Sequence, residues 1–238
     1  MSYALAIGKK DKLHCLSEYT SKSDQILKSS STYIACHRSQ NKVFIKMEST
    51  EIIAELLSSI GSDSIRTESL TLLEQGESRY LRDLKLNFNS MLSSEHLSLK
   101  EIGLLGLACA TNQLNKPLTA FFTAFSKDHG ANAADLAEAV ACASLLSSNN
   151  VFYRFRHFTQ KEKYAQIPAR IRMQVMMNPV TGKEFFELMS LAISAINGCE
   201  MCVNAHESSL IKMGTIEERI FDAIRIASLV TATSKVVF

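Results

Sequence analysis

The chain repeats itself with a period of 84 residues, and this internal repeat constrains the fold more than any other feature. The two copies align without a gap, and leucines, alanines, a serine and a glycine of the first copy recur in the second. A gapless repeat of this kind indicates a duplicated structural unit. We expect the copies to span about residues 98–150 and 182–234. The matched pairs are Leu104 with Leu188, Leu107 with Leu191, Ala108 with Ala192, Gly130 with Gly214, Ala139 with Ala223, Ala143 with Ala227, Ser144 with Ser228 and Leu145 with Leu229.

The hydrophobic pattern of both copies is helical. From about Thr67 to the C-terminus, apolar residues recur at helical spacing, alternating β-branched runs are few, and the whole chain has only three prolines. Gly130 and Gly214 each follow an apolar segment, as is typical of a residue that ends a helix. The sequence therefore predicts an all-α fold built from a duplicated helical unit.

Residues 1–46 differ from the rest of the chain. They are rich in serine and lysine and show no sustained helical period. We expect them to form a loosely ordered N-terminal extension, followed by an all-helical domain over residues 47–238. Hydrophobic residues make up 46% of the chain, which is enough to build a core for that domain.

The composition argues against several classes of partner. A formal net charge of +2 is too small to argue for binding to a nucleic acid. No apolar run approaches the roughly 18 residues that span a bilayer, and the first residues lack the order of a secretory signal. We therefore expect a cytoplasmic protein without a membrane partner, in a compartment that keeps most thiols reduced.

Two thiols and an imidazole lie close together in the second copy. Cys199 and Cys202 are three residues apart, and His206 follows four residues later. On a helix these spacings place all three side chains on one face. A close cysteine pair in a reducing compartment is more often catalytic or metal-binding than structural. Two thiols beside a base are also suited to forming and breaking a disulfide.

The first copy of the repeat serves as an internal control for this motif. Opposite Cys199, Cys202 and His206 it has Asn115, Leu118 and Phe122, and opposite Met201 it has Pro117. Proline is tolerated in a helix only in the first turn, so Pro117 predicts that Asn115 caps a helix. Cys199 then occupies the same capping position. Both thiols lie in a first helical turn, where the helix dipole lowers the pKa of a thiol.

Glu187 is a candidate partner for the imidazole. Asn197 and Gly198 predict a turn that closes a helix over residues 184–196. Two antiparallel helices joined at that turn would place Glu187 beside His206. A carboxylate in that place fixes the tautomer of the imidazole and raises its basicity.

Five stretches of the sequence carry a family resemblance. They are Phe185–Leu188, Ala195–Cys199, Cys202–Glu207, Asn149–Arg154 and Met176–Pro179. Together they resemble the alkyl hydroperoxidase D (AhpD) branch of the carboxymuconolactone decarboxylase-like superfamily, over roughly residues 79–238. The glutamate, the Cys-x-x-Cys pair and the histidine at this spacing are specific, whereas a bare Cys-x-x-Cys pair is not.

The resemblance implies a duplicated all-helical fold, assembled as a homotrimer, with peroxide- and disulfide-reducing activity and no tightly bound cofactor. By position, Cys202 is the peroxidatic thiolate that becomes a sulfenic acid. Cys199 donates the proton and then resolves the sulfenic acid into the Cys199–Cys202 disulfide. His206 and Glu187 form the proton relay.

The resemblance also implies partners. In the family, dihydrolipoamide reduces the disulfide. It is the reduced lipoyl group of a dihydrolipoamide acyltransferase, and dihydrolipoamide dehydrogenase reduces that group again. The reduced protein in turn regenerates the peroxiredoxin AhpC. Two departures stand out: Met201 replaces a histidine that some members carry, and the first sixty or so residues have no counterpart in the short members.

Two other uses of the same cluster remain open. A binding or adaptor protein would use the disulfide as a redox switch and not for turnover. A zinc-binding adaptor would take Cys199, Cys202 and His206 as ligands, with Glu187 or water as the fourth. Structural zinc sites usually draw ligand pairs from separate segments, which counts against zinc.

The remaining candidates have weaker patterns. Cys109 and Cys142 fall on apolar helical faces and are predicted to be packing residues. Cys15 and Cys36, in the extension, have no partner pattern and receive no role. The polar and aromatic cluster after the first copy suits a subunit contact, a docking surface or a solvated helix end. Its members are Tyr153, Arg154, Arg156 and His157.

Overall fold

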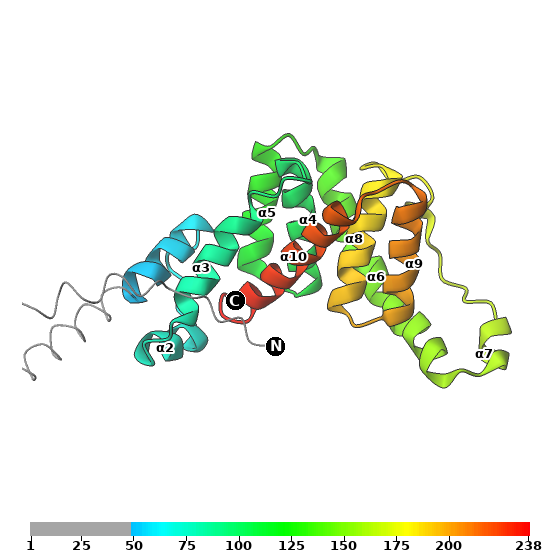
Figure 1. The fold of residues 1–238 in the computed structure, drawn as a ribbon, viewed down its shortest axis with the longest axis horizontal. Helices are drawn as coiled ribbons and strands as arrows, with labels where there is room; N and C mark the ends of the chain where they lie inside the picture. The colour runs from blue at the N-terminus through cyan, green and yellow to red at the C-terminus, as the bar shows by residue number, and fades with distance from the viewer. Residues whose placement is uncertain (1–48) are drawn as a thin grey trace, which may run out of the picture. The chain divides into compact units, whose positions relative to one another are not determined.

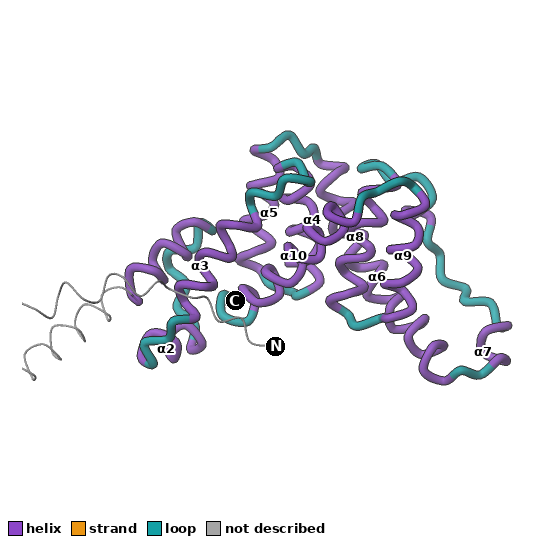
Figure 2. Tube along the Cα trace, in the orientation of Figure 1, coloured by secondary structure: helices purple, strands orange, loops and turns teal. Residues whose placement is uncertain are grey.

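The computed structural model describes residues 49–238, and the predicted extension over residues 1–46 lies outside them. The described residues are all helical apart from their connecting loops (Figure 2). Residues 49–59 form the first helix. The others, in chain order, are α2 Glu68–Gln75, α3 Tyr80–Met91, α4 Leu99–Asn112, α5 Lys116–Asp128, α6 Ala133–Thr159, α7 Glu162–Gln166, the 3-10 helix η1 Gln174–Met176, α8 Lys183–Ile196, α9 Glu200–Lys212 and α10 Glu217–Ser234. None of the helices in this part of the chain is long and apolar enough to cross a membrane.

The structure confirms the all-α fold with a duplicated helical unit. Helices α4, α5 and α6 form the first copy, and α8, α9 and α10 form the second (Figure 1). Each helix of the second copy begins 84 residues after its counterpart, which is the period of the repeat. The two copies therefore share helix boundaries as well as residue types.

The turn between the first two helices is also the same in both copies. The amide of Asn115 donates to the carbonyl of Ala110 at 3.0 Å, and the amide of Cys199 donates to the carbonyl of Ser194 at 3.1 Å. The residue before each of these amides has a positive φ, 54° at Leu114 and 67° at Gly198. A glycine adopts this left-handed backbone without strain, and a leucine does not. The second copy thus has the less strained turn, immediately before Cys199.

Helices α4 and α8 lie at the centre of the fold. All residues from Ile102 to Ala110 of α4 are buried, and α8 is buried almost as completely from Phe185 to Ser194. A helix that is apolar on all sides has to be surrounded by other helices. The α8–α9 turn, and the cysteine pair that follows it, are therefore held by a central helix.

Two buried carboxylates tie each copy to the other. Glu138 of α6 accepts from the backbone amides of Val180 and Thr181, at 2.6 Å and 2.7 Å, just before α8 begins. Asp222 of α10 stands 84 residues later and lies just before α4 in space, where it accepts from the Ser94 hydroxyl at 2.7 Å. The third helix of each copy therefore anchors the entry to the first helix of the other copy.

Candidate active site

The cysteine pair lies at the start of α9, where the repeat predicts it. Cys199 is the N-cap of α9 and Cys202 lies in its first turn. The two cysteines form a disulfide, with Cα atoms 5.3 Å apart. Cys199 is fully buried, whereas Cys202 retains 7% of its surface exposed. Any reagent from solvent therefore reaches the Cys202 side of the pair first.

The N-cap position of the second helix differs between the copies: it is Asn115 in the first copy and Cys199 in the second. In the first copy, the side chain of Asn115 accepts from the amide of Leu118 at 2.9 Å and caps α5. In the second copy, the side chain of Cys199 makes no such capping bond. The helix end can therefore stabilise a negative charge that develops on sulfur once the disulfide is reduced.

His206 and Glu187 meet across the α8–α9 pair. Nδ1 of His206 lies 2.6 Å from Oε2 of Glu187, and the two side chains are only 12% and 14% exposed. This contact leaves the other ring nitrogen, Nε2, without a hydrogen bond to any described residue. Cys202 lies one turn before His206 on the same face of α9. The arrangement places a carboxylate, an imidazole and a disulfide along one side of the helix pair.

A network of amide side chains holds the turn before Cys199. The side chain of Asn197 donates to Asn150 at 2.9 Å and accepts from Asn112 at 3.0 Å. Asn150 in turn donates to the hydroxyl of Ser194 at 2.9 Å. The guanidinium of Arg154 donates to the carbonyl of Asn197. The turn is therefore fixed from α4 and α6 as well as from its own helices.

The sequence alone does not assign this bracing role to Asn112 or Asn150. Asn150 and Arg154 belong to one of the stretches that carry the family resemblance, which could have pointed to them. Nothing in the local pattern around Asn112 indicates a contact with residue 197. Together with Ser147 and Val151, these residues line a small cavity of about 240 Å³ beside the turn.

The other described cysteines are buried in the core. Cys109 and Cys142 are both fully buried, in agreement with the packing role that the sequence predicts. Burial raises the pKa of the Cys142 thiol to about 12, and the nearby charges of Glu138 and Glu187 also raise it. Burial likewise raises the pKa of Cys109 far above its usual value. Neither thiol ionises readily near neutral pH, so neither is a nucleophile of the site.

The cluster after the first copy borders the site through two of its members. Arg154 contacts the Asn197 carbonyl, and Nε2 of His157 lies 3.6 Å from a carboxylate oxygen of Glu200, the residue after Cys199. The guanidinium of Arg156 instead lies 4.6 Å from the centre of the Phe152 ring and 5.9 Å from that of Tyr153. Within residues 49–238, no three or more histidine, cysteine, aspartate or glutamate side chains are grouped so that they could hold a metal ion.

Comparisons with known proteins identify the family of this chain. The model of the carboxymuconolactone decarboxylase family matches residues 162–237, which include the cysteine pair and His206. An alkyl hydroperoxide reductase AhpD of Bradyrhizobium sp. is 39% identical over 166 residues, covering 70% of this chain and 91% of the relative. The AhpD of Rhodopseudomonas palustris is 37% identical over the same length and coverage. The AhpD of Brucella canis is 39% identical over 155 residues, covering 65% of this chain and 88% of the relative. The chain therefore belongs to the AhpD family of alkyl hydroperoxide reductases.

Proposed function

We propose that this protein is a thiol-dependent alkyl hydroperoxidase and disulfide reductase that works in cytoplasmic antioxidant defence. The observation that carries the proposal is the Cys199–Cys202 disulfide at the start of α9, one turn from the hydrogen-bonded His206–Glu187 pair. A disulfide at a helix start is one of the two states through which such an enzyme cycles. The relatives' names supply the substrate class, an alkyl hydroperoxide.

The first half of the cycle consumes the peroxide. The Cys202 thiolate attacks one peroxide oxygen, so that an S–O bond forms and the O–O bond breaks. The alkoxide leaves as an alcohol with a proton that comes from the Cys199 thiol. Cys202 is now a sulfenic acid, and Cys199 is the thiolate that resolves it. The greater exposure of Cys202 supports its assignment as the sulfur that meets the peroxide.

The second half regenerates the disulfide and then the thiols. The Cys199 thiolate attacks the Cys202 sulfur, so that the S–S bond forms and the S–O bond breaks. The hydroxide leaves as water with a proton from the His206 imidazole. A dithiol then returns two electrons by thiol–disulfide exchange. The proposed reductant is dihydrolipoamide, carried by a dihydrolipoamide acyltransferase and recharged by dihydrolipoamide dehydrogenase. The reduced protein would pass electrons on to the peroxiredoxin AhpC.

His206 and Glu187 would act as the proton relay. The carboxylate holds Nδ1 of the imidazole, so that Nε2 is the nitrogen that takes up and returns protons at the sulfurs. The low exposure of both side chains supports this role, because a relay shielded from water keeps the proton within the site. We further propose that the working protein is a homotrimer, as the resemblance implies.

The decisive experiment follows the sulfenic acid. Cys202→Ser should lower peroxide consumption with dihydrolipoamide by at least about 100-fold, because it removes the nucleophile. In Cys199→Ser, a sulfenic-acid probe should label Cys202 and the label should persist, because no resolving thiol remains. Cys109→Ala removes a buried thiol outside the site and should leave turnover unchanged.

Other results would favour the alternatives. Full activity of Cys202→Ser, or a probe label on Cys199 alone, would reject the proposed roles. A protein that reacts with peroxide once and does not turn over with dihydrolipoamide would be a redox switch. Stoichiometric zinc in freshly purified protein, removed by a chelator, would indicate the zinc-binding adaptor.

A further inference from the structure

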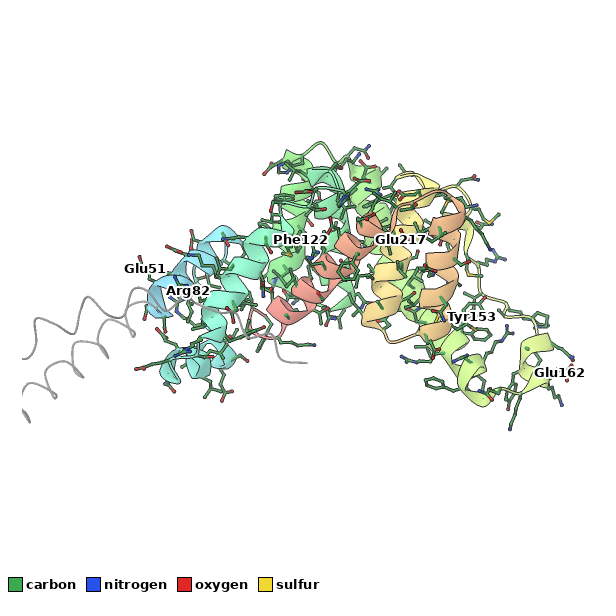
Figure 3. All side chains as sticks on the ribbon, in the orientation of Figure 1. Glu51, Arg82, Phe122, Tyr153, Glu162 and Glu217 are labelled. Carbon is green, nitrogen blue, oxygen red and sulfur yellow. A yellow bond between two sulfur atoms is a disulfide. The ribbon has the colours of Figure 1, made fainter. Side chains whose placement is uncertain are left out.

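Helix α6 is longer than its counterpart in the second copy. α10 ends at Ser234, which the 84-residue shift places opposite Asn150, whereas α6 continues to Thr159. The last turns of α6 and helix α7 extend away from the other helices (Figure 1). Tyr153 and Glu162 mark this segment in Figure 3. We call residues 151–172 the basic arm.

The basic arm differs in charge from the rest of the described chain. It has six lysines and arginines and one acidic residue, a formal net charge of +5. The other described residues, 49–150 and 173–238, have twelve basic and nineteen acidic side chains, a formal net charge of −7. A positively charged arm is attracted to a negatively charged protein surface, such as that of the rest of this chain in another copy.

The basic arm also carries an exposed apolar stripe. Val151, Phe155 and Phe158 are 61%, 49% and 71% exposed, and their spacings of four and three residues place them on one face of α6. Helix α7 buries none of its residues. A helical extension that exposes such a stripe to water gains stability when another surface covers it.

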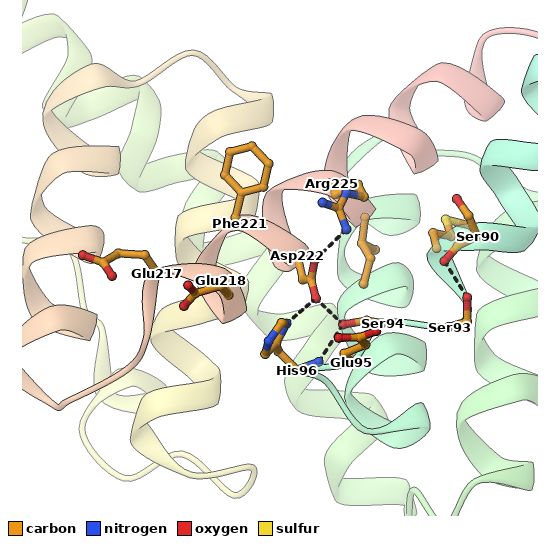
Figure 4. Close-up of a pocket in the computed structure, with 12 residues that line it drawn as sticks. Ser90, Ser93, Ser94, Glu95, His96, Glu217, Glu218, Phe221, Asp222 and Arg225 are labelled. Carbon is orange, nitrogen blue, oxygen red and sulfur yellow. Dashed lines mark hydrogen bonds and ion pairs between the residues drawn. The ribbon is translucent and has the colours of Figure 1, made fainter.

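A cavity elsewhere on the molecule has the complementary chemistry. It has a volume of about 520 Å³ and lies between the segment that precedes α4 and the first half of α10 (Figure 4). Glu95, Glu217 and Glu218 line it and form no ion pair with another residue of the described chain. The one arginine in its lining, Arg225, pairs with Asp222 at 2.7 Å, so the lining keeps an excess of negative charge. Phe221, 66% exposed, stands at the same cavity. We call this cavity the acidic pocket.

We propose that the basic arm of one copy of this protein docks into the acidic pocket of a second copy. Exposed cations of the arm, Lys163, Arg170 and Arg172, would face the three glutamates. The aromatic stripe would pack against Phe221. A protein's own arm does not fill its pocket, because Tyr153 and Glu162 lie well apart from Glu217 in the structure (Figure 3). The docking surfaces contain neither the cysteine pair nor the His206–Glu187 pair.

The geometry of such a contact limits the assembly. The arm and the pocket are different surfaces, so the contact is heterologous, and each copy offers one arm and one pocket. Contacts of this type close into rings when the rotation between copies allows it. The arm also starts beside the cysteine pair, through Arg154 on the Asn197 carbonyl and His157 near Glu200. Docking would therefore place the second copy against the segment that braces the active-site turn.

A charge-swap experiment on the full-length protein tests the proposal by sedimentation. Arm variant Lys163→Glu/Arg172→Glu and pocket variant Glu95→Lys/Glu218→Lys should each weaken self-association by about tenfold or more, because like charges then face each other. The variant that combines all four changes should associate like the wild type. Phe158→Ser should also weaken association, without any change in charge.

Two controls distinguish a loss of docking from a general effect of net charge and from a loss of the fold. Arg79→Glu/Lys116→Glu changes the net charge as much as the arm variant, at exposed positions outside both surfaces, and should associate like the wild type. A wild-type protein that is monomeric at tens of micromolar would overturn the proposal. So would an arm or pocket variant that assembles normally, or a combined variant that folds, by circular dichroism, and stays dissociated.

Discussion

At the scale of single residues, the duplication shows what the active copy had to change. Gly103 stands opposite Glu187, and Phe122 stands opposite His206. An added Cβ at Gly106 would overlap the Phe122 ring. In the first copy, packed apolar groups therefore occupy the place that the His206–Glu187 pair takes in the second copy. The second copy holds a buried carboxylate against an imidazole only because the two groups satisfy each other.

The Glu187–His206 contact predicts a specific kinetic defect. Glu187→Gln should lower kcat/KM for peroxide by about 10- to 100-fold and alter the pH profile of the rate, because the amide neither fixes the imidazole tautomer nor supports its positive charge. Steady-state kinetics from pH 5 to 9 would measure it. Glu207→Gln makes the same chemical change at an exposed position of α9 and should have no effect. An unchanged profile in Glu187→Gln would remove the glutamate from the relay.

The burial of the core thiols predicts selective alkylation. After reduction, iodoacetamide at pH 8 should label Cys202 in the folded protein and leave Cys142 unlabelled, because burial raises the pKa of Cys142 to about 12 and excludes the reagent. Peptide mass spectrometry identifies the labelled positions. Denaturant should expose Cys142 to the same reagent. Rapid labelling of Cys142 without denaturant would show that the core opens there.

At the scale of helices, α4 and α5 approach each other more closely than the side chains of most residues allow. Gly106 faces the Phe122 ring, and Gly103 faces the backbone and hydroxyl of Ser126. In the second copy the position of Gly106 is taken by Ser190, whose hydroxyl lies 3.7 Å from the sulfur of Cys142. The position therefore faces Phe122 of α5 in the first copy, whereas its counterpart in the second copy contacts Cys142 of α6.

The close approach of α4 and α5 predicts that adding one methyl group at Gly106 lowers the stability of the fold. Gly106→Ala should destabilise the fold by about 1–3 kcal/mol, because the added Cβ forces the Phe122 ring or the helix to move. Urea denaturation followed by circular dichroism would measure the change. Ser190→Ala is the matched control, since that position already accommodates a Cβ, and it should cost less. Equal losses in both variants would show that the steric argument is wrong.

At the scale of the whole molecule, the copies hold each other through paired charges. Lys100 and Asp135 pair at 2.6 Å in the first copy, and their counterparts Glu184 and Arg219 pair at 2.9 Å in the second with the signs exchanged. Arg219 also pairs with Glu101 of α4 at 2.5 Å, which joins the two copies directly. Separating the copies would break these contacts as well as the core.

Two buried carboxylates, Asp222 and Asp135, predict how stability depends on pH. Burial alone would raise the pKa of Asp222, but hydrogen bonds from Ser94 and His96 and the charge of Arg225 lower it. Burial would also raise the pKa of Asp135. The hydrogen bond and the charge of Lys100 outweigh that effect, so the pKa of Asp135 is lowered. A carboxyl whose pKa is lower when folded than the unfolded value of about 3.9 stabilises the fold above that pH.

The stability from these groups should therefore be complete above about pH 5 and should fall as the pH drops through their folded pKa values, below 4. Thermal melts between pH 2.5 and 7 would record it. Asp222→Asn should lower the melting temperature at pH 7 and flatten its decline in acid. A wild-type melting temperature that stays constant down to pH 3 would contradict this account.

The sequence by itself determined the features that depend on local pattern. Helical periodicity and the gapless repeat were enough for the all-α duplicated fold, and Pro117 placed Cys199 at a helix start, because proline restricts its own backbone. Only the tertiary structure decided most contacts between distant segments. The sequence predicts that Glu187 lies beside His206, and the structure confirms the contact. The sequence does not predict that Asn150 contacts the active-site turn or that the basic arm stays uncovered. These depend on how helices cross, and the angle between two packed helices follows from the whole core and not from any one stretch of the chain.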